Sequence, residues 1–220
     1  MLLFEHGEFT MYLAALFRED RIDVLHAFIR SHPLGLLVSH GPAGLVANLL
    51  PFVLKSGASE RGVLQAHMAR ANPQWRELDH QPALVVFRGP DAYVSPSLYA
   101  TKKETGKVVP TWNYAMVQAR GTAKVQDTSD WLTPQLSALT TAREARRPQP
   151  WSVTDAPPDY VEAQKKAIVG VEIEIARLEG KWKVSQNQPE ANRRSVVAGF
   201  SADESTREMA ELVRTYGKLE

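Results

Sequence analysis

Two long stretches of the sequence alternate between residue types, and this pattern constrains the fold more than any other feature. In WNYAMVQARGTAKV (112–125), Trp112, Tyr114 and Met116 share one side of an extended chain, while Ala115 and Val117 share the other. In VGVEIEIARLEG (169–180), apolar residues alternate with acidic ones. A period of two belongs to a strand, because successive side chains point to opposite faces of a sheet. We therefore expect a mainly β core.

Shorter apolar runs predict further strands. They lie at 34–39, 45–54, 62–68, 83–89 and 92–95. Turn residues such as Gly41 and Gly44 separate the first two, which predicts a hairpin. Pro51 within the second arm indicates a bulge or a sheet edge, because proline has no N–H for the hydrogen-bond ladder.

Four helices are expected outside the strands. The first runs from a cap at Asp20 to about residue 31, and part of 130–146 forms the second, capped by Asp130 or Thr133. A third covers 159–167. The last covers 201–217, where Ser201 and Glu204 have the spacing of a capping box. Short strands with a few helices outside them predict a small β-barrel with helical additions.

The composition excludes several classes of site. With 26 Lys and Arg against 25 Asp and Glu, the net charge is +1, whereas a nucleic-acid binder usually has a basic excess. The chain has no cysteine, which excludes disulfides, thiol catalysis and iron–sulfur clusters. No apolar run is long enough to cross a bilayer, and the start lacks the features of a signal peptide. We expect a soluble cytoplasmic protein and no metal site.

Polar residues crowd the segment AHMARANPQWR (66–76), which directly follows a predicted strand. His67, Arg70 and Asn72 can present donors there, and a guanidinium fork matches the oxygens of a phosphate. The alternative is that the arginines pair at the surface with Glu77 or Asp79.

Two further segments are unusually polar for their neighbourhood. In PTWNYAMV (110–117), Trp112 and Tyr114 could form a stacking wall and Asn113 could read the edge of a ring, although aromatic residues at period two more often pack in the core. EGKWKVSQNQPEANRR (179–194) groups polar side chains after a strand, and the alternative is an ordinary polar loop. Its polar residues are Lys181, Lys183, Ser185, Gln186 and Asn187.

Taken together, these segments resemble the PaiB-type family, the FMN-binding negative transcriptional regulators. The matching stretches are MYLAALF (11–17), PLGLLVS (33–39), NLLPFVL (48–54), AHMARANPQW (66–75), GPDAYVSPSLY (89–99), PTWNYAMV (110–117) and EIEIARLEGKWKVSQN (172–187). They cover about residues 11–200 in the family's order and spacing. The sequence differs from the family pattern at Leu13, Ala14, Asn48 and Asn192.

The resemblance implies a mainly β fold with α additions, the split β-barrel related to pyridoxamine-phosphate-oxidase and flavin-reductase barrels. It implies a homodimer with the flavin near the subunit interface. Residues 1–10 are then an N-terminal extension, 11–200 the FMN-binding domain with a helical insertion near 130–167, and 201–220 a C-terminal helix.

The cofactor implied is FMN, and the resemblance assigns its contacts. Arg70 would pair with the phosphate, Asn72 with a phosphate or ribityl oxygen, and His67 would lie nearer the ring. The other residues expected at the site are Met68 and Ala69 beside that turn, Leu50, Pro51 and Phe52 along the ring, Trp112 and Asn113 from the partner subunit, and Lys183, Ser185 and Gln186 closing the phosphate end.

No catalytic constellation is evident, since the sequence has no HExxH, P-loop, GxGxxG or Ser–His–Asp spacing. The resemblance implies a negative transcriptional regulator. No helix-turn-helix is visible, so any DNA contact would depend on local basic patches such as that around Arg193 and Arg194. The alternative is a flavin-dependent oxidoreductase of the related barrel class, and a third hypothesis is a member that has lost the flavin.

Overall fold

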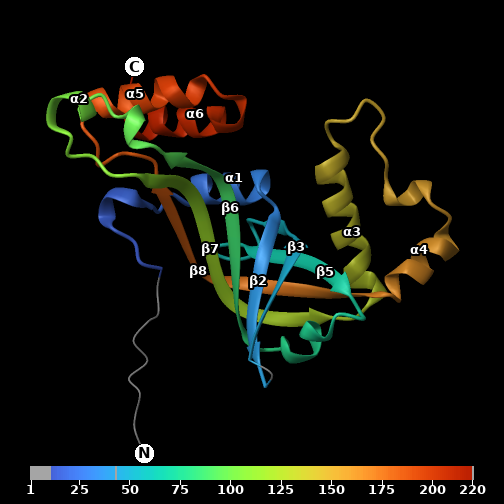
Figure 1. Cartoon of the computed structure of the whole chain (residues 1–220). Coiled ribbons are helices and arrows are strands. Elements are labelled where there is room, and N and C mark those ends of the chain that lie inside the picture. The colour runs from blue at the N-terminus through green and yellow to red at the C-terminus, as the bar shows by residue number, and fades with distance from the viewer. Residues whose placement is uncertain (1–10, 43, 220) are drawn as a thin grey trace, which may run out of the picture. The chain divides into compact units, whose positions relative to one another are not determined.

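Eight strands form one antiparallel sheet in the computed structural model, which describes residues 11–42 and 44–219 (Figure 1). The predicted extension at 1–10 lies outside the described residues. The strands are β1 (Arg18–Glu19), β2 (Leu34–Gly41), β3 (Gly44–Pro51), β4 (Val53–Lys55), β5 (Val63–Ala69), β6 (Pro82–Val94), β7 (Thr111–Gln126) and β8 (Ile168–Lys183). Their order is β3-β2-β6-β7-β8-β5-β4, and β1 pairs with β8.

The predicted strands are confirmed, except that two of them are merged and one, the arm predicted at 45–54, is divided into β3 and β4 at Phe52. The runs at 83–89 and 92–95 belong to a single strand, β6, so Gly89 and Pro90 lie inside it rather than in a turn. Proline is compatible with this because its φ also suits extended backbone. Pro51 ends β3, which is an edge strand, as its missing N–H predicts.

The chain divides into two compact units. The central unit comprises Asp20–Arg88 and Val117–Leu178, and the end unit comprises the chain up to Glu19, Gly89–Met116 and the chain from Glu179 onward. Strands β6, β7 and β8 contribute residues to both. Each unit is described below by itself.

The central unit contains the hairpin β2–β3, in register from Leu34 opposite Pro51 to Gly41 opposite Gly44. Its core is made by the inward residues of the alternating strands, so that Leu37, Leu64 and Phe87 have no exposed surface. Strand β8 pairs with β5 along Val63–Ala69.

Three helices belong to the central unit: α1 (Ile22–Ser31), α3 (Ser129–Glu144) and α4 (Pro158–Lys165). The predicted caps were wrong. Arg21 precedes α1 without a side-chain cap, and α3 is capped by Thr128, whose hydroxyl accepts a hydrogen bond from the N–H of Trp131. α3 packs close to β8, because a Cβ on Gly170 would lie 2.2 Å from the Trp131 ring.

The end unit contains α2 (Lys102–Thr105), α5 (Glu190–Ser201) and α6 (Arg207–Tyr216). The predicted helix 201–217 with a Ser201 cap was wrong, because Ser201 ends α5 and α6 starts only at Arg207. Asp203 caps the short helical turn between them by accepting from the N–H of Ser205. α5 itself was not predicted.

Candidate functional site

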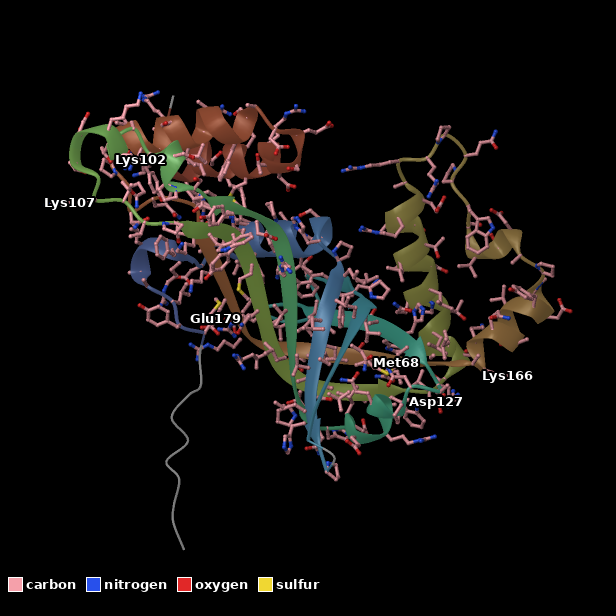
Figure 2. All side chains as sticks on the ribbon, in the orientation of Figure 1. Met68, Lys102, Lys107, Asp127, Lys166 and Glu179 are labelled. Atoms are coloured by element: carbon pink, nitrogen blue, oxygen red, sulfur yellow. The ribbon has the colours of Figure 1, made fainter. Side chains whose placement is uncertain are left out.

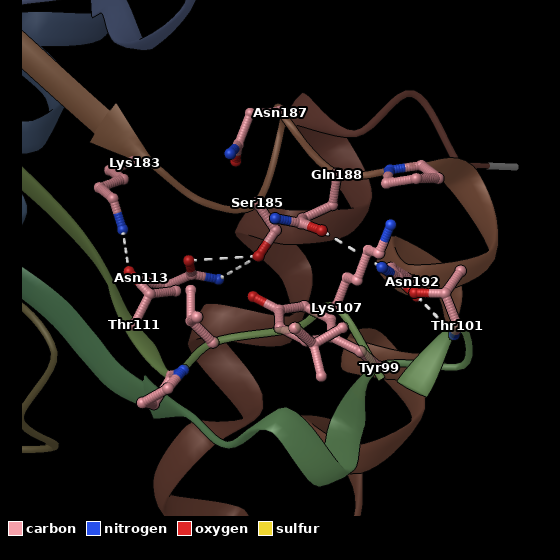
Figure 3. A pocket seen from close by; sticks show the side chains of 14 residues that line it. Tyr99, Thr101, Lys107, Thr111, Asn113, Lys183, Ser185, Asn187, Gln188 and Asn192 are labelled. Atoms are coloured by element: carbon pink, nitrogen blue, oxygen red, sulfur yellow. Dashed lines mark hydrogen bonds between the residues drawn. The ribbon is translucent and has the colours of Figure 1, made fainter. Parts of the chain in front are cut away.

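A polar pocket of about 330 Å³ lies in the end unit, where β7 begins and β8 ends (Figure 3). The loop 107–110 and the start of α5 complete its wall. The polar side chains that line it include Thr111, Asn113, Lys183, Ser185, Gln188, Asn192, Lys107 and Tyr99. Three of these, Asn113, Lys183 and Ser185, were predicted site residues.

A buried amide–hydroxyl pair forms one side of this pocket. Asn113 is only 1% exposed, and its Nδ2 donates to Ser185 Oγ at 2.9 Å, while Ser185 Oγ also lies 3.2 Å from Asn113 Oδ1. Ser185 has a φ of 66°, a conformation that L residues rarely adopt and that the surrounding bonds must support. The turn after β8 therefore directs the Ser185 hydroxyl toward the side-chain amide of Asn113, and the left-handed backbone of Ser185 is strained in doing so.

Lys183 lies beside this pair. Its Nζ donates to Thr111 Oγ1 at 2.6 Å (Figure 3) and to the carbonyl oxygen of Trp112, also at 2.6 Å. Partial burial lowers the pKa of Lys183, and the charge of Lys181 lowers it further. No carboxylate pairs with Lys183 among the described residues. Its ammonium is thus solvated only by neutral oxygens, which suits it to an anionic ligand.

The opposite wall depends on residues that the sequence did not indicate. Asn192 of α5 is 2% exposed, and its Oδ1 accepts from the N–H and the hydroxyl of Thr101. Its Nδ2 donates to Gln188 Oε1 at 3.2 Å. These bonds fix the loop that carries Lys107 into the pocket, a second lysine with no carboxylate partner in the described chain. Pro189 before Glu190, a common start of a helix, was the available signal for α5.

Trp112 does not pack in the core, contrary to the usual expectation for an aromatic residue in a strand. It is 54% exposed and meets Tyr93 edge to face, with ring centroids 5.8 Å apart. Its backbone carbonyl accepts from Lys183, but its indole lies on the face of β7 opposite to Asn113 and does not line the pocket. The exposed indole is open to a ligand on that face, where its ring neighbour is Tyr93 and not the predicted Tyr114.

Gln186 has a structural role in this turn. Its Oε1 accepts from the N–H of Val184 at 2.7 Å, and its Nε2 donates to the carbonyl of Trp182. Because both ends of the amide are bonded to the backbone, Gln186 supports the turn and does not line the pocket.

The second group of predicted residues follows β5 in the central unit. Arg70 donates both terminal nitrogens to Asp127, and it also donates to the carbonyls of Lys166 and Ile168. Figure 2 shows Met68, Asp127 and Lys166 at the same end of β5 and β8. The carboxylate bonded to Arg70 is thus Asp127, and not Glu77 or Asp79 as the alternative prediction had it. The hydrogen bond from Arg70 lowers the pKa of Asp127.

The other residues of this turn have local roles. Asn72 caps the helical turn Pro73–Glu77 by accepting from the N–H of Gln74 at 3.0 Å. His67 Nδ1 lies 2.9 Å from Gln135 Oε1. Met68 is buried in the core, and Ala69 is exposed.

The predicted ring-facing segment 50–52 turns its side chains inward. Leu50 is 6% and Phe52 3% exposed, and Phe52 packs edge to face on Phe87. Only the backbone around Pro51 and the partly exposed proline ring are available to a ligand. The structure thus groups Trp112, Asn113, Lys183 and Ser185 in the end unit, whereas the turn residues and segment 50–52 belong to the central unit.

The described residues contain no group of three or more His, Cys, Asp or Glu side chains arranged to hold a metal ion. None of the helices described has both the length and the apolar character needed to span a membrane.

Comparison with known proteins gives consistent matches. The model of a family described as "Putative FMN-binding domain" matches residues 11–177. An uncharacterised protein of Emericella nidulans is 36% identical, with 95% of this chain and 98% of that protein covered. The protease synthase and sporulation protein PAI 2 of Bacillus subtilis is 29% identical, with 92% of this chain and 96% of that protein covered.

Solved structures show the same fold at low sequence identity. A conserved hypothetical protein from Mycobacterium tuberculosis has a TM-score of 0.56 at 14% identity, covering 80% of this chain and 93% of that one. An FAD and heme binding protein from Mycobacterium smegmatis has a TM-score of 0.55 at 17% identity, covering 76% and 73%. The mainly β fold with helical additions, a split β-barrel, is confirmed.

Proposed function

We propose that this chain, which belongs to the PaiB-type family of FMN-binding proteins, holds FMN partly through its end-unit pocket. The observation that carries the proposal is the partly buried ammonium of Lys183, which lacks a carboxylate partner among the described residues and donates to the backbone carbonyl of Trp112, a residue whose exposed indole lies on the other face of β7. A dianionic phosphate supplies the missing charge, and an indole face suits a flat heterocycle. The Asn113–Ser185 pair adds a hydroxyl and an amide at the same place.

Arg70 can bind a phosphate only if the phosphate replaces its present partner, Asp127. Its fork is held by Asp127, and the two side chains are 36% and 50% exposed. Ion pairs this exposed contribute little to stability, because water and salt screen them. Asp127 accepts from the same guanidinium donors that a phosphate would use. A phosphate with two charges can therefore replace this carboxylate.

We also propose that the functional form is a homodimer with the flavin near its interface. The outward faces of β3, β2 and β6 form an apolar surface, because register places Leu36 beside both Leu49 and Val86. Leu34, Leu45 and Leu49 on this surface are 55%, 76% and 59% exposed. Such a surface is larger than scattered apolar residues explain, and a second copy would cover it. Following the sequence-based expectation, one copy contributes the Arg70 turn and the other contributes Trp112.

The experiment for the cofactor is a visible spectrum of the purified protein, with the released compound identified, followed by titration of the flavin-free protein with FMN. We expect flavin absorbance and a 1:1 ratio per chain. A protein that stays colourless in excess FMN would contradict the proposal. Analytical ultracentrifugation tests the dimer. Leu49→Glu should shift the protein from dimer to monomer. Leu45→Gln, a milder change at another outward residue of β3, should shift the equilibrium less.

A role in gene regulation is the function we favour, since the Bacillus subtilis relative is named for protease synthesis and sporulation, two processes that are controlled at the level of gene expression. Direct operator contact has little support in the charges of the helix pair. Arg194 is paired with Glu190 and Arg214 with Glu211, which leaves little excess charge for phosphates. We therefore propose regulation through a small molecule or protein partner. A salt-sensitive shift of promoter DNA by the pure protein would show direct binding instead.

The second candidate is a flavin-dependent oxidoreductase. The exposure of Trp112 and Tyr93 favours it, because a flavin against these rings would stay open to a second reactant. FMN, when bound, supplies the electron-transfer chemistry that the side chains lack. Steady consumption of NAD(P)H by the FMN-loaded protein would favour this candidate, and no consumption would favour the regulator.

A further inference from the structure

A second pocket, of about 310 Å³, lies within the central unit between the helical segment 129–167 and the adjoining ends of β5 and β8. We propose that it binds an uncharged planar aromatic molecule that carries an acceptor oxygen. The pocket is lined mainly by apolar and aromatic side chains from the helical segment, among them Leu136, Trp151, Val153 and Tyr160. Its size and apolar lining are those of small-molecule sites.

The aromatic walls indicate the shape of the ligand. Trp151 is 48% and Tyr160 57% exposed although both border the pocket. Large aromatic side chains usually bury more of their surface, and a flat ring between them would gain stacking as well as apolar contact. Neither ring has a ring partner in the described structure that would compete for its faces.

Among the polar residues that line the pocket, which include Thr140, Gln164 and Lys165, His67 has a ring nitrogen left without a partner in the part of the chain that the structure describes. Its Nδ1 lies 2.9 Å from the amide of Gln135, which is only 1% exposed and whose Nε2 has no acceptor in the conformation described. A buried NH2 without an acceptor costs more than an unpaired carbonyl oxygen. The amide orientation that removes this cost donates Nε2–H to His67 Nδ1, and the proton of the neutral imidazole then lies on Nε2. Nε2 has no other partner in the described chain, so the ligand should offer it an oxygen.

The charges in the pocket disfavour an anionic ligand. Lys165 lines it and is 6% exposed, but its Nζ is paired with Glu162 and donates to Thr133 Oγ1 at 2.9 Å. The hydrogen bond from Lys165 lowers the pKa of Glu162, so this carboxylate carries its charge at neutral pH. Because this cation is already neutralised, a ligand carboxylate would lose its hydration without gaining a counter-charge. A neutral oxygen, such as a ketone, meets no such cost.

Isothermal titration calorimetry of the full chain with 2-acetylnaphthalene and 2-naphthoate tests the proposal, since the two probes share a ring and differ in charge. We expect the ketone to bind at least roughly 10-fold more tightly than the carboxylate. Trp151→Ala should weaken ketone binding by roughly 10-fold. His67→Phe, which keeps the ring but removes the donor, should weaken it by roughly 3- to 10-fold. Tyr12→Ala, an exposed aromatic of the end unit, is the control and should change nothing.

Circular dichroism and thermal unfolding show whether each variant is folded, and a ¹⁵N spectrum of the histidines gives the tautomer of His67 independently of any variant. Equal binding of the two probes, unchanged binding by Trp151→Ala, or a proton on Nδ1 would overturn the proposal. The site does not depend on FMN. Saturating FMN should therefore leave ketone affinity unchanged, and competitive displacement would assign the pocket to the flavin instead.

Discussion

Lys165 is buried and Lys183 partly buried, and each lines a pocket, yet their surroundings differ. Lys183 is bonded to a threonine hydroxyl and a backbone carbonyl, whereas Lys165 is paired with Glu162. Burial without a counter-charge lowers the pKa of Lys183 and leaves its ammonium in need of an anion. The comparison shows that the partner set, more than burial, decides which ligand a lysine can recognise.

The largest effect is expected from Arg70→Ala. This variant tests whether the phosphate proposed to bind Lys183 is also bound by Arg70. A charge-assisted phosphate bond contributes about 1.5–3 kcal/mol, so FMN affinity should fall by roughly one to two decades. Asp127→Asn should raise FMN affinity a few-fold, because it weakens the competing partner of Arg70. Fluorescence titration of flavin-free protein measures both. Equal affinities in all three proteins would remove Arg70 from the phosphate site.

Ser185→Ala and Thr133→Ala compare how much one hydroxyl contributes to stability in each lysine pocket. Ser185 lines the pocket of Lys183 and bonds Asn113, and Thr133 accepts from Lys165. Removing the Ser185 hydroxyl leaves the buried amide of Asn113 without its partner, which should lower the free energy of unfolding by about 1–3 kcal/mol. Thr133→Ala should cost less, since Lys165 keeps Glu162. Urea denaturation measures both, with Ser205→Ala as a surface control. A larger loss for Thr133→Ala would reverse the comparison.

The smallest effect is expected in the pH dependence of binding. Lys183 has a lowered pKa, so it loses its proton at a lower pH than an ordinary lysine. An anion binds the charged form, and FMN affinity should therefore decline several-fold as the pH rises through this lowered pKa. 2-Acetylnaphthalene should bind equally well over the same range. Parallel titrations from neutral to alkaline pH measure this, and a flat FMN profile would mean that the charge of Lys183 is not used.

Local patterns predicted the fold well. Alternation gave β7 within one residue at each end and β8 within one residue at its start and three at its end, and the missing N–H of Pro51 predicted a bulge or an edge, of which the structure has the edge. The helix α5 was missed because its first turn, rich in charged and amide residues, resembles a loop, although Val196, Val197 and Phe200 have helical spacing. Polar character at a helix start reflects solvation and capping, so it is a weak guide to backbone conformation.

The candidate site was only partly predictable, because its defining contacts join residues far apart in the sequence. Asn113 and Ser185 are 72 positions apart, and Arg70 and Asp127 are 57 apart. The sequence indicates that Arg70 and Gln186 can donate hydrogen bonds. It could not indicate that Arg70 is already bonded to Asp127, or that Gln186 is already bonded to the neighbouring backbone. Lys107 was not among the predicted site residues, although it lines the pocket.

The most direct test is the ratio of the affinities for FMN and for riboflavin, which lacks the phosphate, in the wild type, Lys183→Met and Lys165→Met. Wild type and Lys165→Met should prefer FMN by the same factor, and Lys183→Met should lose roughly 10-fold or more of that preference while binding riboflavin unchanged. If Lys183→Met keeps the full preference for FMN, its uncompensated ammonium does not recognise the phosphate.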